Sequence, residues 1–193
     1  RRLGAIGSSV IICILREDVL VRSNVRVEAI PSGAPIELQA GQLAQITQAL
    51  GGSFTLLVEG QLTRLKGVDA DAIGKTPPQT APVPTEVHDG DVEPLVWDAL
   101  RTCYDPEIPV NIVDLGLVYR CALEPLEDSD KLRVVIDMTL SAPGCGMGEA
   151  IADEVCDKVL ALPRVGEITV NMVFTPPWDR SMMSEAAQLA LGL

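Results

Sequence analysis

A proline-rich stretch divides the sequence into two halves with different hydrophobic patterns. Residues 75–94 contain Pro77, Pro78, Pro82, Pro84 and Pro94 and show no apolar periodicity, which is typical of an extended linker. Before this stretch, short alternating runs are punctuated by glycine turns; after it, helix-like and strand-like patterns follow one another. The sequence therefore predicts two folded units, with a linker over residues 75–90 between them.

The first unit, residues 23–74, has the pattern of a small β-rich domain. Val25, Val27 and Ala29 alternate with polar residues, and Pro31-Ser32-Gly33 forms a turn signal before the alternation resumes. Further glycine turns separate apolar runs over 43–48, 54–58 and 61–65. About five short strands are expected to form a meander or partial barrel, which is marginally stable alone and so needs a partner or the second unit. Residues 1–22 form an N-terminal segment whose structure the pattern does not indicate.

The second unit, residues 91–193, predicts a sandwich with element order α-β-β-α-β-α. Its first helix places apolar residues at 96, 99, 100 and 103 on one face. Alternating runs over 117–123 and 132–140 are expected to pair as a hairpin, and an apolar stripe over 147–162 indicates a helix that Pro163 stops. A third strand over 168–172 and a final helix complete an α+β fold: helices packed on a three-stranded sheet, preceded by the small β-rich unit.

Charge and hydropathy exclude several classes of function. The chain has 27 acidic and 15 basic residues, a net charge of −12 and only 3% aromatic residues, which disfavours nucleic acid as a partner. No apolar run approaches the roughly 20 residues that span a bilayer, so no membrane partner is expected. The apolar run 3–15 after Arg1 and Arg2 resembles a weak signal peptide but lacks a small-residue cleavage site before Arg16. We therefore expect a cytoplasmic location.

Cys145 is the strongest candidate for chemistry. It follows a strand and a Pro-Gly turn and falls at the expected start of a helix, where unpaired N–H groups and the helix dipole favour a thiolate, the form that binds metal. Gly144, Gly146 and Gly148 leave room around it for a bulky ligand or a second backbone. The alternative is that the glycines only permit the turn and that Cys145 packs as a small apolar residue.

The other cysteines and the single histidine offer less. The five cysteines are odd in number and form no C-x-x-C pair, which favours neither a disulfide framework nor a zinc ribbon. Cys103, Cys121 and Cys156 fall in helix or strand patterns where packing is the usual role. His88 lies in the linker, so it is expected to be solvated rather than a ligand.

Carboxylate and hydroxyl side chains flank the segments near Cys145. Asp105, Glu107 and Asp114 bracket a proline-rich loop, where they could contact a metal or cap turns, and turn capping is the commoner role. Thr139 and Ser141, at the strand end before Cys145, could donate hydrogen bonds to a sulfur atom or serve ordinary strand and turn duties.

Three motifs, in this order, resemble those of a known family. They are Asp105-Pro106-Glu107-Ile108-Pro109-Val110-Asn111-Ile112-Val113-Asp114-Leu115-Gly116-Leu117-Val118-Tyr119, then Ala142-Pro143-Gly144-Cys145-Gly146-Met147-Gly148, then Pro176-Pro177-Trp178 with Met183-Ser184-Glu185-Ala186. Together they resemble the metal-sulfur cluster biosynthetic family of iron-sulfur protein maturation. The segments at 30–33, 47–55 and 69–74 resemble the N-terminal extension that marks its SufT branch.

The resemblance implies an α/β domain over 91–193 whose main functional residue is the helix-start cysteine, here Cys145. It further implies that the neighbouring acidic and hydroxyl positions fall on Asp105, Glu107, Asp114, Thr139 and Ser141. Ala142 stands where many relatives carry a second threonine, so the resemblance does not supply a hydroxyl pair here.

The leading hypothesis is a non-enzymatic accessory factor in iron-sulfur cluster assembly that binds or transfers a cluster or iron transiently through Cys145. One strong thiolate is too few for a four-thiolate cluster, so a homo-oligomer or a partner protein is expected to supply other ligands. The expected partners are iron-sulfur assembly proteins and client apo-proteins. One alternative is a non-catalytic adaptor that bridges assembly machinery and clients. A thiol-dependent enzyme is less favoured, because the only histidine lies in the linker.

Overall fold

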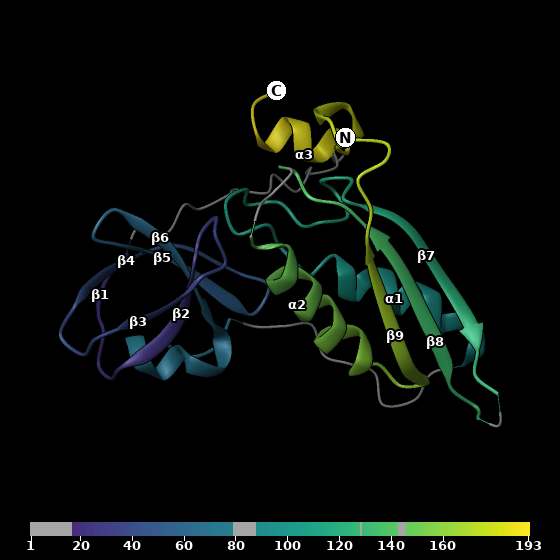
Figure 1. Cartoon of the computed structure of the whole chain (residues 1–193), viewed down its shortest axis with the longest axis horizontal. Coiled ribbons are helices and arrows are strands. Elements are labelled where there is room, and N and C mark those ends of the chain that lie inside the picture. Colours follow the sequence, from purple (N-terminus) through teal and green to yellow (C-terminus); the bar gives the residue numbers. More distant parts are fainter. Residues whose placement is uncertain (1–16, 79–87, 128, 143–145) are drawn as a thin grey trace, which may run out of the picture.

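The computed structural model describes residues 17–78, 88–127, 129–142 and 146–193. It contains two sheets, one in each half of the chain, and Figure 1 shows helix α2 lying between them. The central part of the predicted linker, residues 79–87, lies outside the described residues. Within the described ranges, no helix is both long enough and apolar enough to cross a bilayer.

The N-terminal sheet has six antiparallel strands in the order β1-β4-β5-β6-β2-β3. We call residues 17–74 the β-domain. The β4–β5 hairpin turns at Gly51 and Gly52, which both have positive φ, as a two-residue turn between twisted strands requires. The strands are β1 (Glu17–Leu20), β2 (Val25–Ala29), β3 (Pro35–Leu38), β4 (Leu43–Leu50), β5 (Ser53–Val58) and β6 (Gln61–Lys66), and the 3-10 helix η1 (Gly67–Ile73) follows.

The β-domain is covered on more than one side. In β5, Phe54 and Leu56 face the core of the β-domain, yet Thr55 between them is also buried, with 5% of its surface exposed. Strand β6 repeats this pattern with Thr63, Arg64 and Leu65. Because successive side chains of a strand point to opposite faces, a run of buried residues means that both faces are covered. The second face is covered in part by residues 88–193, which we call the C-terminal domain, because Thr55 and Arg64 both contact residues there.

The C-terminal domain has the predicted α+β fold. Strands β7 (Val118–Pro125) and β8 (Leu132–Met138) form the predicted antiparallel hairpin, and β9 (Val165–Met172) pairs with β8 in parallel. Helix α2 (Gly148–Leu160) makes the crossover between the parallel strands and contacts β9 and helix α1 (Val92–Leu100). The short helices η2 (Asp89–Asp91) and η3 (Arg180–Met182) and the last helix, α3 (Glu185–Ala190), complete the domain.

The apolar core of the C-terminal domain follows the sequence periodicity. Alternate residues of β8 and the i, i+4 stripe of α2 are buried and belong to one cluster. Ile30, a residue of the β-domain, is part of the same cluster and is 2% exposed. The two domains therefore share apolar packing as well as polar contacts.

One expectation about helix α1 is wrong. The helix ends at Leu100, so Cys103 lies three residues beyond it rather than on its face. The hydroxyl of Thr102 donates to the carbonyl of Ala99 at 2.6 Å, a local bond that competes with helix continuation. Cys103 is still buried in the core, with 1% of its surface exposed, so its predicted packing role is confirmed.

Candidate functional site

The predicted site residues come from three segments of the C-terminal domain. They are the loop between α1 and β7, the end of β8, and the segment before α2. Cys145, with Pro143 and Gly144, lies outside the described residues. Helix α2 begins at Gly148, with Met147 at its N-cap position.

Asp105 organises the loop after α1. It is 6% exposed, and its Oδ1 accepts hydrogen bonds from the backbone N–H groups of Glu107 at 2.8 Å and Ile108 at 2.9 Å. Its other carboxylate oxygen, Oδ2, accepts a hydrogen bond from the hydroxyl of Ser141 at 3.3 Å. One carboxylate therefore holds the turn and joins it to the end of β8, which brings two predicted site residues together.

The remaining predicted residues have other surroundings. Thr139 is 1% exposed, and its backbone N–H donates a hydrogen bond to the carbonyl of Leu117 at 2.8 Å. Glu107 is exposed. The carboxylate of Asp114 accepts a hydrogen bond from the side-chain amide of Asn111 at 2.6 Å. This hydrogen bond lies within the turn that contains Asp114 and does not connect it to Asp105.

The three described cysteines outside this segment are poor thiolates. Burial raises the pKa of the Cys103 thiol to about 12, with Lys158 opposing and Glu154 adding to the shift. Burial, followed by the charge of Glu93, raises the pKa of Cys121 to about 11. The pKa of Cys156 is also raised, first by burial and then by its acidic helix neighbours. All three are free cysteines that stay protonated near neutral pH.

No group of three or more histidine, cysteine or acidic residues within the described ranges is arranged to hold a metal ion. A cavity of about 470 Å³ opens beside the β4–β5 hairpin, with Phe54, Lys75, Arg101 and Tyr104 among its lining residues. None of the five described site candidates lines this cavity. We call the loop between α1 and β7, residues 101–117, the Asp105 loop. The candidate site is therefore assigned to the Asp105 loop and the segment before α2, and not to this cavity.

Comparison with known proteins identifies the family. A model of the iron-sulfur cluster assembly protein family matches residues 94–170. The chain is 43% identical over 93 residues to an Fe-S protein maturation auxiliary factor of Porphyromonas gingivalis, covering 48% of this chain and 84% of that protein. It is 40% identical over 89 residues to the Fe-S protein maturation auxiliary factor SufT of Staphylococcus aureus, covering 46% and 96%. This chain belongs to the iron-sulfur cluster assembly protein family.

Solved structures of similar proteins include a domain of unknown function from Bacillus anthracis. It is 39% identical, with a TM-score of 0.47, and the match covers 54% of this chain and 94% of that one. The solution structure of Rv1466 from Mycobacterium tuberculosis, described as associated with Fe-S complex assembly and repair, is 31% identical, with a TM-score of 0.36, and covers 59% and 97%.

The residues that match the family lie in only one of the two domains of this chain. About half of this chain accounts for 84% and 96% of the two maturation factors, and the family model lies entirely within the C-terminal domain. The β-domain lies outside the residues that the family model matches. Its contacts with the Asp105 loop are therefore an addition to the part that defines the family.

Sequence reasoning missed those contacts. The side-chain amide of Gln48 donates to the carbonyl of Asp105 at 3.3 Å, and the hydroxyl of Thr55 donates to the carbonyl of Pro106 at 3.3 Å. A Cβ placed on Gly146 would overlap the carbonyl oxygen of Ser32. The backbone of Ser32 therefore occupies the space that a side chain at position 146 would fill. The sequence predicts that this glycine leaves room for either a bulky ligand or a second backbone segment, and the second of these is found.

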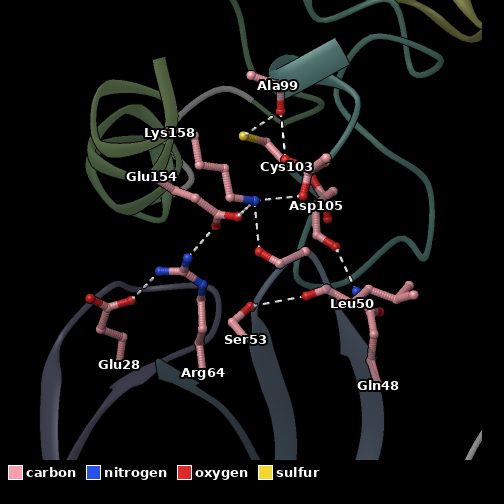
Figure 2. A network of polar contacts seen from close by, with 12 residues as sticks. Glu28, Gln48, Leu50, Ser53, Arg64, Ala99, Cys103, Asp105, Glu154 and Lys158 are labelled. Atoms are coloured by element: carbon pink, nitrogen blue, oxygen red, sulfur yellow. Dashed lines mark hydrogen bonds and ion pairs between the residues drawn. The ribbon is translucent and has the colours of Figure 1, made fainter. Parts of the chain in front are cut away.

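A partly buried network of charges joins α2 to the β-domain (Figure 2). Arg64 on β6 pairs with Glu28 at 3.0 Å and with Glu154 on α2. Lys158, one turn further along α2, pairs with Glu154 at 2.6 Å and donates to the carbonyls of Gly51 and Thr102, both at 2.7 Å. Arg is rarely buried unless it is paired, so the burial of Arg64 in the structure marks this interface.

Proposed function

We propose that this chain is a non-enzymatic accessory factor in iron-sulfur cluster assembly and protein maturation. The observation that supports this most strongly is its identity of 40% or more to two proteins named Fe-S protein maturation auxiliary factors, over nearly the whole of each. The proposed setting is the cytoplasm, where thiols stay reduced. The proposed partners are iron-sulfur assembly proteins and client apo-proteins.

The proposed cargo group is a cluster or iron, held transiently through Cys145. The protonation of the described cysteines supports this choice, because burial keeps the thiols of Cys103, Cys121 and Cys156 from acting as ready thiolate ligands. Cys145 is flanked in sequence by two exposed residues, Ala142 and Gly146, on either side of the undescribed segment.

Other ligands are needed beside one cysteine. Iron-sulfur clusters are usually held by four thiolates, so a second copy of this chain or a partner protein would complete the set. Asp105 and Ser141 are proposed as the nearest supporting groups, because their side chains are bonded to each other at the end of the strand that leads to Cys145. Glu107, Asp114 and Thr139 are proposed as further polar neighbours of the site.

Anaerobic reconstitution with iron and sulfide tests this function. Wild type, Cys145→Ser and the matched control Cys156→Ser should be compared by visible absorption, iron content and oligomeric mass. We expect cluster absorption in the wild type and in Cys156→Ser and its loss in Cys145→Ser. Equal iron in all three would refute the role of Cys145. If none of the three binds iron, the carrier function is wrong and the adaptor alternative takes its place.

A further inference from the structure

The β-domain holds the backbone of the Asp105 loop from outside. Gln48 on β4 and Thr55 on β5 lie on neighbouring strands and donate to the consecutive carbonyls of Asp105 and Pro106. Thr55 and Pro106 are both buried, so this contact is shielded from water. A hydrogen bond in such a place is worth more than one at the surface, because the alternative is an unpaired polar group in a dry environment.

The two sides of the loop backbone are therefore held by different domains. Its N–H groups, on Glu107 and Ile108, are bound by the Asp105 carboxylate of the loop itself. Two of its carbonyls are bound by the β-domain. Since the same carboxylate also accepts the hydroxyl of Ser141, the position of the loop determines whether Asp105 and Ser141 meet.

Other contacts between the two domains hold the β-domain in place beside this loop. The turn at Ser32 and Gly33 lies against the backbone of Gly146. A Cβ on Gly33 would overlap the backbone of Gly146, and a Cβ on Gly146 would overlap the backbone of Ser32. The ion pair of Arg64 with Glu154 fixes β6 to α2. The loop, Gly146 and helix α2 therefore all contact the β-domain of the same chain.

We propose that Gln48 and Thr55 are positioning residues for Asp105 and Ser141 of the candidate site, and that the β-domain is a built-in partner of the loop that carries Asp105. The inference rests on the proposed function. Neither side chain contacts the cargo; both act through the Asp105 loop, which they keep in the conformation that joins Asp105 to Ser141. Loss of their hydrogen bonds loosens the loop first and reduces iron retention as a consequence.

Amide hydrogen exchange on the full chain tests the positioning step without iron. Thr55→Val keeps the shape of the side chain and removes its donor, and Gln48→Ala removes the other. Loss of one net hydrogen bond should speed exchange of the Glu107 and Ile108 amides about fivefold, and loss of both more than tenfold. The matched control is Thr63→Val, because Thr63 is equally buried and donates at the same 3.3 Å to a carbonyl inside the β-domain.

Iron content after anaerobic reconstitution tests the consequence. We expect the double variant to retain less than half of the wild-type iron and Thr63→Val to retain all of it. Unchanged amide exchange in the double variant would overturn the inference, and so would faster exchange with full iron retention. A wild type that binds no iron overturns the proposed function, whereas the exchange measurement still decides whether Gln48 and Thr55 position the loop.

Discussion

Arg64 carries one of the charges that join the two domains, and its replacement by alanine should lower the free energy of unfolding. Its side chain is 7% exposed and that of Glu154 is 11% exposed, so both charges have lost most of their water. Removing one partner of a buried ion pair typically costs about 3–5 kcal/mol, because the other charge is left unpaired. Glu154 retains Lys158 at 2.6 Å, which places Arg64→Ala near the lower end, at about 3 kcal/mol.

Urea unfolding of the full chain measures this effect. Fluorescence of Trp97 and Trp178 reports on the C-terminal domain, and circular dichroism reports on both domains. The matched control is Arg133→Ala, because Arg133 also pairs with a glutamate, Glu167, at 2.6 Å, but with both side chains about half exposed. That surface pair should contribute at most about 1 kcal/mol.

The conservative variant Arg64→Lys adds a second comparison. Lysine keeps the charge but loses the fork of donors that allows Arg64 to bind Glu28 and Glu154 at once, so an intermediate loss is expected. If Arg64→Ala destabilised the chain no more than Arg133→Ala, the buried network would not hold the domains together, and the reasoning from burial would be wrong.

Two further predictions concern the C-terminal domain. Gly146→Ala should lower the free energy of unfolding in urea by about 1–3 kcal/mol, because its Cβ would overlap the backbone of Ser32. The control Gly148→Ala should be near neutral, since its Cβ meets only the side chain of Leu140. Equal effects of the two variants would contradict the close approach at Ser32. Cys103 titrates near its ordinary pKa of 9.0 when unfolded but near 12 when folded, so between those pH values the unfolded state binds fewer protons and stability falls as pH rises. The free energy of unfolding, measured by urea titration above pH 9, should therefore fall by up to about 1.4 kcal/mol per pH unit more in the wild type than in Cys103→Ala, and parallel pH profiles would refute the shift.

The C-terminal fold was predictable because its core follows simple periods. Alternate residues of β8 and every fourth residue of α2 are buried, and the sequence shows both patterns directly. The end of α1 was not predictable in this way. Apolar spacing extended the helix to Cys103, but the side chain of Thr102 bonds to the backbone and ends it earlier.

Docking of the β-domain could not be read from periodicity, because it depends on polar residues that look like ordinary strand residues. Gln48 and Thr55 reach partners that are 57 and 51 residues away in sequence. Nothing local distinguishes Thr55 from Thr47 on β4, whose hydroxyl donates to a carbonyl within the β-domain. Only the three-dimensional arrangement shows which hydroxyl crosses the interface.

Asp105 acts as a turn cap in the structure and keeps part of its capacity to accept further contacts. Its sequence context allowed either a turn cap or a metal contact, and the structure shows the cap, with Oδ1 occupied by two N–H groups. Each carboxylate oxygen has two lone pairs, and the Ser141 hydroxyl takes one on Oδ2. Any contact of Asp105 with iron would therefore use the remaining capacity of Oδ2 while Oδ1 keeps the turn. A carboxylate held in this way brings little freedom of its own to the site, so its orientation depends on the loop and on the β-domain that holds the loop.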